Sequence, residues 1–296
     1  RSYSVTGVQT CALPIFDYTH DERFLTANKK ALSFLESLVS VCQGSIGMHN
    51  ARNTDYIVPY GIARFLLEND PSDKETAQTL LHILYEKLHS NLHFFHAVDD
   101  RYWCHYIGHS VARAEIILQN QSFVPFSNPK KIVLASPAVF MHSGHLAWHT
   151  EKYNCLVSCL KGGIISLTSQ DNYFSHFGWI VKHGNTEFVS HWWDTTSQFE
   201  TKGNMVKIHN WLIPHKENTS TPFKHFILRI ISYFFGYKII GVLKDRLIFK
   251  KNKNKYTFER EIVFEDYQVL IHDKISGLRR SEERRVGKEC RYRWSP

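Results

Sequence analysis

The sequence predicts an α+β protein with more than one domain, in which a partial α/α toroid of helical hairpins is followed by an antiparallel β-sandwich. Apolar residues recur at helical spacing up to about residue 120, and at every second position after about residue 132. The polar and proline-containing residues 121–131 separate the two patterns, and we interpret them as a linker. The helical domain is therefore expected at residues 17–120 and the sandwich at residues 132–279.

Neither end of the chain is expected to belong to the fold. The run VTGVQTCALPI at residues 5–15 and the run RSEERRVGKECR at residues 280–291 match translated sequencing adapters. We expect residues 1–16 and 280–296 to be disordered artefacts around an internal fragment, with a basic nucleic-acid-binding tail as the alternative. Residues 1–16 carry one net positive charge and residues 280–296 carry three. Without these two segments the formal charge falls from +8 to +4. That value does not favour nucleic acid as a partner.

Four amphipathic helices in succession are typical of antiparallel helical hairpins. The second of them is expected to bury Ile62, Phe65 and Leu66, and the third begins at a capping box, Ser72 to Glu75. The four helices are expected at about residues 22–42, 58–68, 72–88 and 101–119.

After the linker, short runs with a period of two are separated by turn residues, which favours a sandwich. Residues 183–186, with the sequence HGNT, are expected to form a hairpin turn. The last two strands, at 256–264 and 268–272, should pair with each other. The other strands are expected at 132–135, 138–141, 146–149, 153–160, 164–168, 177–182, 187–191 and 205–212.

A helical insert at residues 222–249 interrupts the strands. Its first part is apolar enough to suggest a membrane span, but four basic or titratable residues lie inside it: Lys224, His225, Arg229 and Lys238. Each Lys or Arg at a bilayer centre costs about 2.5–3.5 kcal/mol. We therefore expect an amphipathic helix at 222–235 with Pro222 in its first turn. The sequence does not favour a membrane partner, and a membrane-surface role for this helix is the alternative.

Histidines and tyrosines gather at two places where proton transfer is chemically feasible. One group shares a face of the fourth helix, and the other lies where helices give way to strands. The alternative for the first group is a half-buried face whose polar tips reach water. The candidate catalytic residues are Tyr102, His105, Tyr106 and His109 on the helix, with His145 and His149 at the junction.

The spacing of His142, His145 and His149 would also suit a transition metal if a turn brought the three rings together. No cysteine or carboxylate cluster supports such a site, so we assign neither a metal nor a cofactor. The sequence also lacks G-x-S-x-G, P-loop and G-x-G-x-x-G motifs, which argues against the commonest hydrolase and nucleotide-binding classes.

Aromatic residues crowd the β-rich part, and their faces can stack on sugar rings, although aromatic residues are also common in cores. Trp192 and Trp193 are adjacent, so in an extended segment one indole should be exposed. The candidate substrate-binding residues are Trp148, Tyr153, Trp192 and Trp193.

Residues 153–163 (YNCLVSCLKGG) and 258–275 (FEREIVFEDYQVLIHDKI), together with the order of helices and strands, resemble the heparinase II/III-like polysaccharide lyases. The resemblance covers most of residues 17–279. It implies β-elimination at a uronic acid, in which a tyrosine or histidine removes the proton next to the carboxylate and a second group protonates the leaving oxygen. The expected function is therefore a carbohydrate-active protein with a polysaccharide or oligosaccharide partner. The alternative is a non-catalytic protein that binds or helps assemble a cell-surface polysaccharide.

Overall fold

The computed structural model describes residues 15–16, 18–42, 49, 59–89, 108–121, 137–169, 172–184, 186–192, 194, 196–215, 221–236, 255–277 and 289–294. Helices and antiparallel β-sheets are both present, as predicted. The chain divides into two compact units. Unit 1 comprises Arg1–Leu156 and Ser166–Phe174, and unit 2 comprises Val157–Ile165 and Ser175–Pro296.

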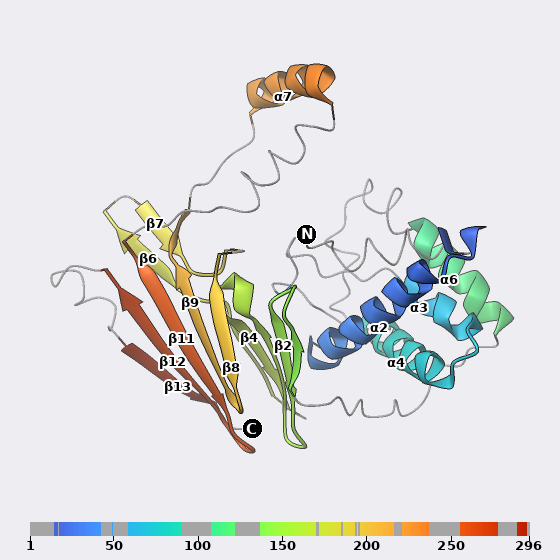
Figure 1. Ribbon diagram of the computed structural model, residues 1–296, viewed down its shortest axis with the longest axis horizontal. Coiled ribbons are helices and arrows are strands. Elements are labelled where there is room, and N and C mark those ends of the chain that lie inside the picture. The colour runs from blue at the N-terminus through green and yellow to red at the C-terminus, as the bar shows by residue number, and fades with distance from the viewer. Residues whose placement is uncertain are drawn as a thin grey trace. The chain divides into compact units, whose positions relative to one another are not determined.

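The helices of unit 1 pack around a shared apolar core. They are α2 (Glu22–Cys42), α3 (Tyr60–Ala63), the 3₁₀ turn η2 (Arg64–Leu67), α4 (Pro71–His89) and α6 (Gly108–Asn120). Helices α2 and α4 lie against each other (Figure 1). The core contains the three residues predicted to point inward from the second helix, Ile62, Phe65 and Leu66. The predicted helix at 22–42 is confirmed, and the one at 58–68 is confirmed with a 3₁₀ last turn.

The start of α4 differs from the predicted capping box. The Asp70 Oδ1 atom accepts a hydrogen bond of 3.0 Å from the backbone N–H of Ser72. The carbonyl of Asp70 accepts another, of 3.1 Å, from the N–H of Lys74. Pro71 therefore stands at the first helical position, where a missing N–H costs nothing. The N-cap is Asp70, and the prediction that Ser72 caps this helix was wrong.

A second apolar cluster joins the helices of unit 1 to its strands. Leu38 of α2 packs with Ala147 and Leu156, and Phe34 packs against the same cluster. Helix α2 therefore has two apolar sides, one facing the helices of unit 1 and one facing its strands.

The strands form three sheets. The first has the order β1-β2-β3-β4-β5, the second β10-β7-β6 and the third β13-β12-β11-β9-β8. The first sheet is built from β1 (Ala138–Phe140), β2 (His145–His149), β3 (Asn154–Ser158), β4 (Ile164–Thr168) and β5 (Tyr173–His176). The second is built from β6 (Ile180–His183), β7 (Thr186–Val189) and β10 (Ile213–His215). The third is built from β8 (Gln198–Lys202), β9 (Met205–Trp211), β11 (Thr257–Phe264), β12 (Val269–Ser276) and β13 (Glu289–Trp294).

Most predicted strands are confirmed where the structure describes them. The β6–β7 hairpin pairs His183 with Thr186, and Gly184 in its turn has φ +57°. The predicted strand at 153–160 is shorter, because Cys159–Lys161 form a 3₁₀ turn, η5. Strands β5, β8 and β10 were not predicted, since they are short or mostly polar and carry little apolar alternation. The predicted strand at 132–135 lies outside the described residues.

Strand β13 lies inside the adapter-like end that was expected to be disordered. It pairs antiparallel with β12, from Val269 opposite Trp294 to Lys274 opposite Glu289. An edge strand presents unpaired N–H and C=O groups that an added extended segment can satisfy, whatever its origin. Residues 289–294 therefore form an edge strand of the third sheet.

Helix α7 (Pro222–Phe235) has the bounds predicted from the sequence, with Pro222 in its first turn. Among the helices that the structure describes, none is both long and apolar enough to cross a bilayer. The shorter helix expected near residues 239–249 lies outside the described part of the chain.

Candidate functional site

A hydrogen-bonded chain in unit 1 runs from a buried imidazole to an exposed phenol. We call His49, Ser166 and Tyr173 the Tyr173 chain. The Nε2 atom of His49 lies 2.8 Å from the Ser166 hydroxyl, which lies 3.3 Å from the Tyr173 hydroxyl. His49 and Ser166 are 3% and 1% exposed, whereas Tyr173 is 58% exposed. The chain therefore connects the interior of unit 1 to its surface.

The local structure explains how these three side chains meet. Strand β4 is buried along its whole length, so the polar side chain of Ser166 needs partners inside the protein. The turn that follows is closed by a hydrogen bond of 2.9 Å from the Ser169 N–H to the Asn172 carbonyl, which brings Tyr173 back beside β4. The imidazole of His49 comes from a distant part of the sequence and completes the chain.

His145 holds the backbone at His49. Its Nε2 atom donates a hydrogen bond of 2.9 Å to the His49 carbonyl, so the Nε2 atom carries a proton. The His145 ring also meets Phe34 edge-on, with ring centroids 5.5 Å apart. His145 thereby positions the histidine of the Tyr173 chain.

The Tyr173 chain can move a proton between surface and interior. When the Nε2 atom of His49 is unprotonated, it accepts the Ser166 proton, and the Ser166 oxygen can then accept the phenolic proton of Tyr173. The reverse sequence returns a proton to Tyr173. Such a chain lets an exposed phenol act as either base or acid while a buried imidazole stores the proton.

His149 lies at the end of β2 and is half-buried. Its Nδ1 atom donates a hydrogen bond of 3.0 Å to the Oδ1 atom of Asn154, at the start of β3. Burial lowers the pKa of His149, while the hydrogen bond to Asn154 acts in the opposite direction. The imidazole is therefore neutral near pH 7.

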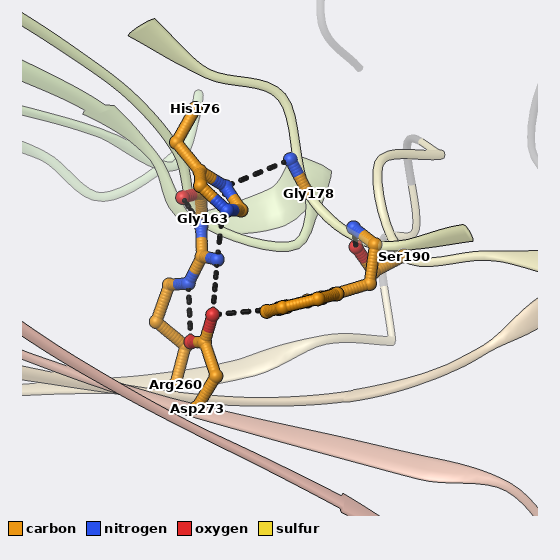
Figure 2. Close-up of polar contacts among 7 residues, drawn as sticks. Gly163, His176, Gly178, Ser190, Arg260 and Asp273 are labelled. Atoms are coloured by element: carbon orange, nitrogen blue, oxygen red, sulfur yellow. Dashed lines mark hydrogen bonds and ion pairs between the residues drawn. The ribbon is translucent and has the colours of Figure 1, made fainter. Parts of the chain in front are cut away.

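A second polar network lies in unit 2 (Figure 2). Its centre is an ion pair between Arg260 and Asp273, which are 0% and 2% exposed. The Nε and Nη2 atoms of Arg260 donate to the two Asp273 carboxylate oxygens at 2.7 and 2.6 Å. The Nη1 atom donates to the Gly163 carbonyl at 2.6 Å. The indole N–H of Trp179 donates a hydrogen bond of 2.6 Å to the Asp273 carboxylate. We call these four residues and His176 the Arg260 network.

His176 closes the network on the other side of the guanidinium. Its Nδ1 atom accepts hydrogen bonds from the Gly178 N–H at 3.1 Å and from the Nη2 atom of Arg260 at 3.2 Å. Burial and the nearby charge of Arg260 lower the pKa of His176, with the Asp273 charge acting in the opposite direction. His176 is thus a neutral acceptor whose proton lies on Nε2.

The strand register explains the ion pair. Arg260 of β11 stands directly opposite Asp273 of β12, and both point to the buried face of the sheet. Gly163, with φ +68°, lets the guanidinium approach, because a Cβ atom there would lie 2.8 Å from the Arg260 Cδ atom. Both carboxylate oxygens have partners inside unit 2. This arrangement suits a structural role.

The sequence-predicted catalytic residues have separate fates. Tyr102, His105 and Tyr106 lie outside the described residues, and His109 is an exposed residue of α6. His145, at 5% exposure, is a core residue and a positioning group. His149 is half-buried. Of the described members of this set, one is therefore exposed, one is half-buried and one is in the core.

The predicted sugar-binding aromatic residues are also divided. Tyr153 is 2% exposed, so neither face of its ring is available for stacking. Trp148 and Trp192 are half-buried, and Trp193 lies outside the described residues. The burial of Tyr153 corresponds to the core alternative that the sequence left open.

The histidine metal site considered from the sequence does not form. His142 is exposed in the turn before β2, whereas His145 points into the core of unit 1. Across the described part of the chain, no group of three or more His, Cys, Asp or Glu residues is placed to hold a metal ion.

Sequence reasoning did not name His49, Ser166 or Tyr173 as a candidate site residue. His49 and Ser166 are 117 positions apart, so no local spacing could relate them. The available signal was weak: a serine between the apolar residues Ile165 and Leu167 of a strand, followed by a turn and a tyrosine.

Comparisons with protein-family models, with characterised proteins and with solved structures gave no match. A function for this chain therefore rests on its own side chains.

Proposed function

We propose that the protein is carbohydrate-active and resembles heparinase II/III-type lyases, cleaving a uronic-acid-containing polysaccharide by β-elimination if it is catalytic. In this proposal the helices belong to a partial α/α toroid and the sheets to an antiparallel β-sandwich. The supporting observation is the exposed phenol of Tyr173, which is hydrogen-bonded through Ser166 to the buried imidazole of His49. A tyrosine able to exchange its proton is the group that this reaction needs.

The reaction would use the Tyr173 chain as follows. The Tyr173 hydroxyl passes its proton to Ser166, while Ser166 passes its own proton to the Nε2 atom of His49. The phenolate then removes the proton next to the substrate carboxylate. The electron pair of that C–H bond forms a carbon–carbon double bond as the bond to the leaving oxygen breaks. The new phenolic proton can then be donated to the leaving oxygen, which leaves an unsaturated uronate as product.

A non-catalytic role in binding or assembling a surface polysaccharide is the second candidate. A uronate lyase could use a cation to bind the substrate carboxylate and a histidine to transfer a proton. In this chain the Arg260 charge is paired with Asp273 inside unit 2, and the His145 ring is in the core. A protein that binds sugar without cleaving it needs only an exposed platform such as the Tyr173 ring.

The test is incubation of the chain with alginate, hyaluronan and heparin-type polymers, with the ultraviolet absorbance of unsaturated products as readout. We expect product formation, and we expect Tyr173→Phe to reduce the rate by about 10²–10⁴-fold, the usual contribution of general acid–base catalysis. Tyr267→Phe is the matched control, because Tyr267 is an exposed tyrosine in the β11–β12 turn and should leave the rate unchanged.

The same samples separate the two candidates. Binding of a polymer without product, weakened in a Tyr173→Ala variant, would support the non-catalytic role and overturn the lyase mechanism. Absence of both product and binding for every polymer would overturn the proposal as a whole. Product formation by Tyr173→Phe at the unchanged rate would remove Tyr173 from the mechanism.

A further inference from the structure

Helix α7 exposes a row of large apolar side chains. Phe223, Phe226, Ile230 and Phe234 are all exposed, and their spacing of three, seven and eleven residues from Phe223 places them on one side of the helix. Tyr233 is 86% exposed beside them. Isolated exposed apolar residues are ordinary, but a contiguous row along a helix marks an interaction surface.

The composition of α7 indicates which partner that surface fits. Its fourteen residues include Lys224, His225 and Arg229 but no aspartate or glutamate. Arg229 is exposed, and its position on the helix lies off the apolar row. The sequence from residue 236 to residue 255 contains seven more Lys and Arg residues and one Asp. The helix thus combines an apolar, aromatic side with basic residues in a strongly basic part of the chain.

Three kinds of partner differ in how well they fit these features. A dissolved anionic polymer would pair with the basic residues but would leave the phenylalanines in water. A second copy of the helix would bury the phenylalanines but would bring like charges together. An anionic bilayer surface satisfies both features, because the apolar side chains enter the acyl boundary while the cations face lipid headgroups.

We propose that α7 is an interfacial helix that binds the protein to the surface of an anionic lipid bilayer, lying in the plane of the membrane. The helix is too short and too basic to span it. Tyr233 suits the membrane–water interface, where Tyr and Trp are enriched. The phenylalanines suit the apolar face that such a helix buries at the acyl boundary. This role does not depend on the Tyr173 chain, and it would hold whether or not the protein cleaves a polysaccharide.

The experiment is co-sedimentation of the chain with lipid vesicles. Vesicles of phosphatidylcholine with about one third phosphatidylserine should bind the protein at least about tenfold more tightly than vesicles of phosphatidylcholine alone. Raising the salt concentration should weaken binding to the anionic vesicles, because exposed charges are screened.

Two substitutions test whether α7 is responsible. Phe226→Glu combined with Phe234→Glu places charges on the apolar row and should abolish vesicle binding. Both side chains are exposed, so the fold should tolerate the change. Tyr267→Glu is the matched control, because it adds a negative charge at an exposed aromatic residue that is not part of α7 and should leave binding unchanged.

Three outcomes would overturn the proposal. The first is no sedimentation with anionic vesicles, and the second is equal loss of binding in Tyr267→Glu. The third is self-association of the free protein, measured by light scattering, that disappears in the double variant while vesicle binding stays absent. That last result would assign the apolar row to a second copy of the chain.

Discussion

The Arg260 network and the Tyr173 chain are both buried polar systems, but they end differently. The central Arg260 and Asp273 side chains meet partners inside unit 2, and both are less than 3% exposed. The Tyr173 chain begins inside unit 1 and ends on a phenol that is 58% exposed. The ion pair at the centre of the Arg260 network is enclosed, although His176 and Trp179 at its edge are half-buried. The Tyr173 chain instead ends on an exposed hydroxyl, which can exchange protons with a bound molecule.

The two systems also use histidine differently. His176 accepts two hydrogen bonds at Nδ1, one of them from a guanidinium, and is therefore kept neutral. His49 meets a serine hydroxyl, a group that can either donate or accept. Only the second arrangement allows a proton to move in either direction. Three changes of decreasing expected size test this contrast.

The largest effect is expected from Arg260→Met. The variant leaves the Asp273 carboxylate buried without its cation, and breaking such a pair costs about 3–5 kcal/mol of unfolding free energy. Urea denaturation measures the loss. Arg64→Met is the comparison variant, since it removes a part-buried Arg–Glu pair with Glu68 and should cost less than Arg260→Met, whose partner carboxylate is fully buried.

A double variant separates the ion pair from simple packing. Arg260→Met with Asp273→Leu removes both charges, so it should be more stable than Arg260→Met alone. If the double variant is less stable than the single one, the Arg260 network does not owe its effect to an unpaired carboxylate, and its assignment as a closed ionic network fails.

A smaller effect is expected when pH is lowered. The pKa of His176 is lowered by burial and by Arg260, so the unfolded chain binds a proton before the folded protein does. Stability is therefore full above the unfolded pKa of about 6.5 and falls as pH decreases from there toward the lower folded pKa. Urea denaturation between about pH 7.5 and pH 5.5 should show this decrease.

The contribution of His176 can be isolated from those of other histidines. Burial also lowers the pKa of His149 and, together with Lys161 and His215, that of His191. A His176→Gln variant keeps a hydrogen-bond acceptor at this position. It should reduce the pH dependence of the unfolding free energy in part, and His149 and His191 should account for the remainder. Two results would contradict a neutral His176 imidazole in the Arg260 network. One is an unchanged slope of unfolding free energy against pH in this variant, and the other is a His176 pKa, measured by NMR, at or above the ordinary value.

The regular elements could be predicted from sequence because their causes are local. Helices α2 and α7 follow from apolar spacing and from residues at their ends, and the β11–β12 pair follows from strict alternation. That alternation also places Arg260 on the face of Phe258, so the position of a buried arginine was available in the sequence. The cap of α4 was misplaced because Asp70 and Ser72 are both good N-caps and only the structure separates them.

The candidate site could not be predicted in the same way. The three members of the Tyr173 chain are His49, Ser166 of β4 and Tyr173 of β5. Only tertiary packing brings His49 to the other two. The sequence analysis named His145 and His149, where helices give way to strands, as candidate catalytic residues. The structure uses His145 to hold the backbone of His49. The prediction therefore reached a residue beside the Tyr173 chain, and that residue positions a member of the chain.

The smallest stability effect is expected at the exposed end of the Tyr173 chain. Tyr173→Phe removes a hydroxyl that water can replace, and it should change the unfolding free energy by less than about 0.5 kcal/mol. Ser166→Ala leaves the buried His49 Nε2 atom without its hydroxyl and should cost about 1–3 kcal/mol. Urea denaturation of the two variants measures this gradient along the chain. If the two variants lost the same unfolding free energy, the Tyr173 hydroxyl would stabilise the fold as much as the buried Ser166 hydroxyl does. The Tyr173 chain would then have a structural role like that of the Arg260 network and would not serve as a route for protons.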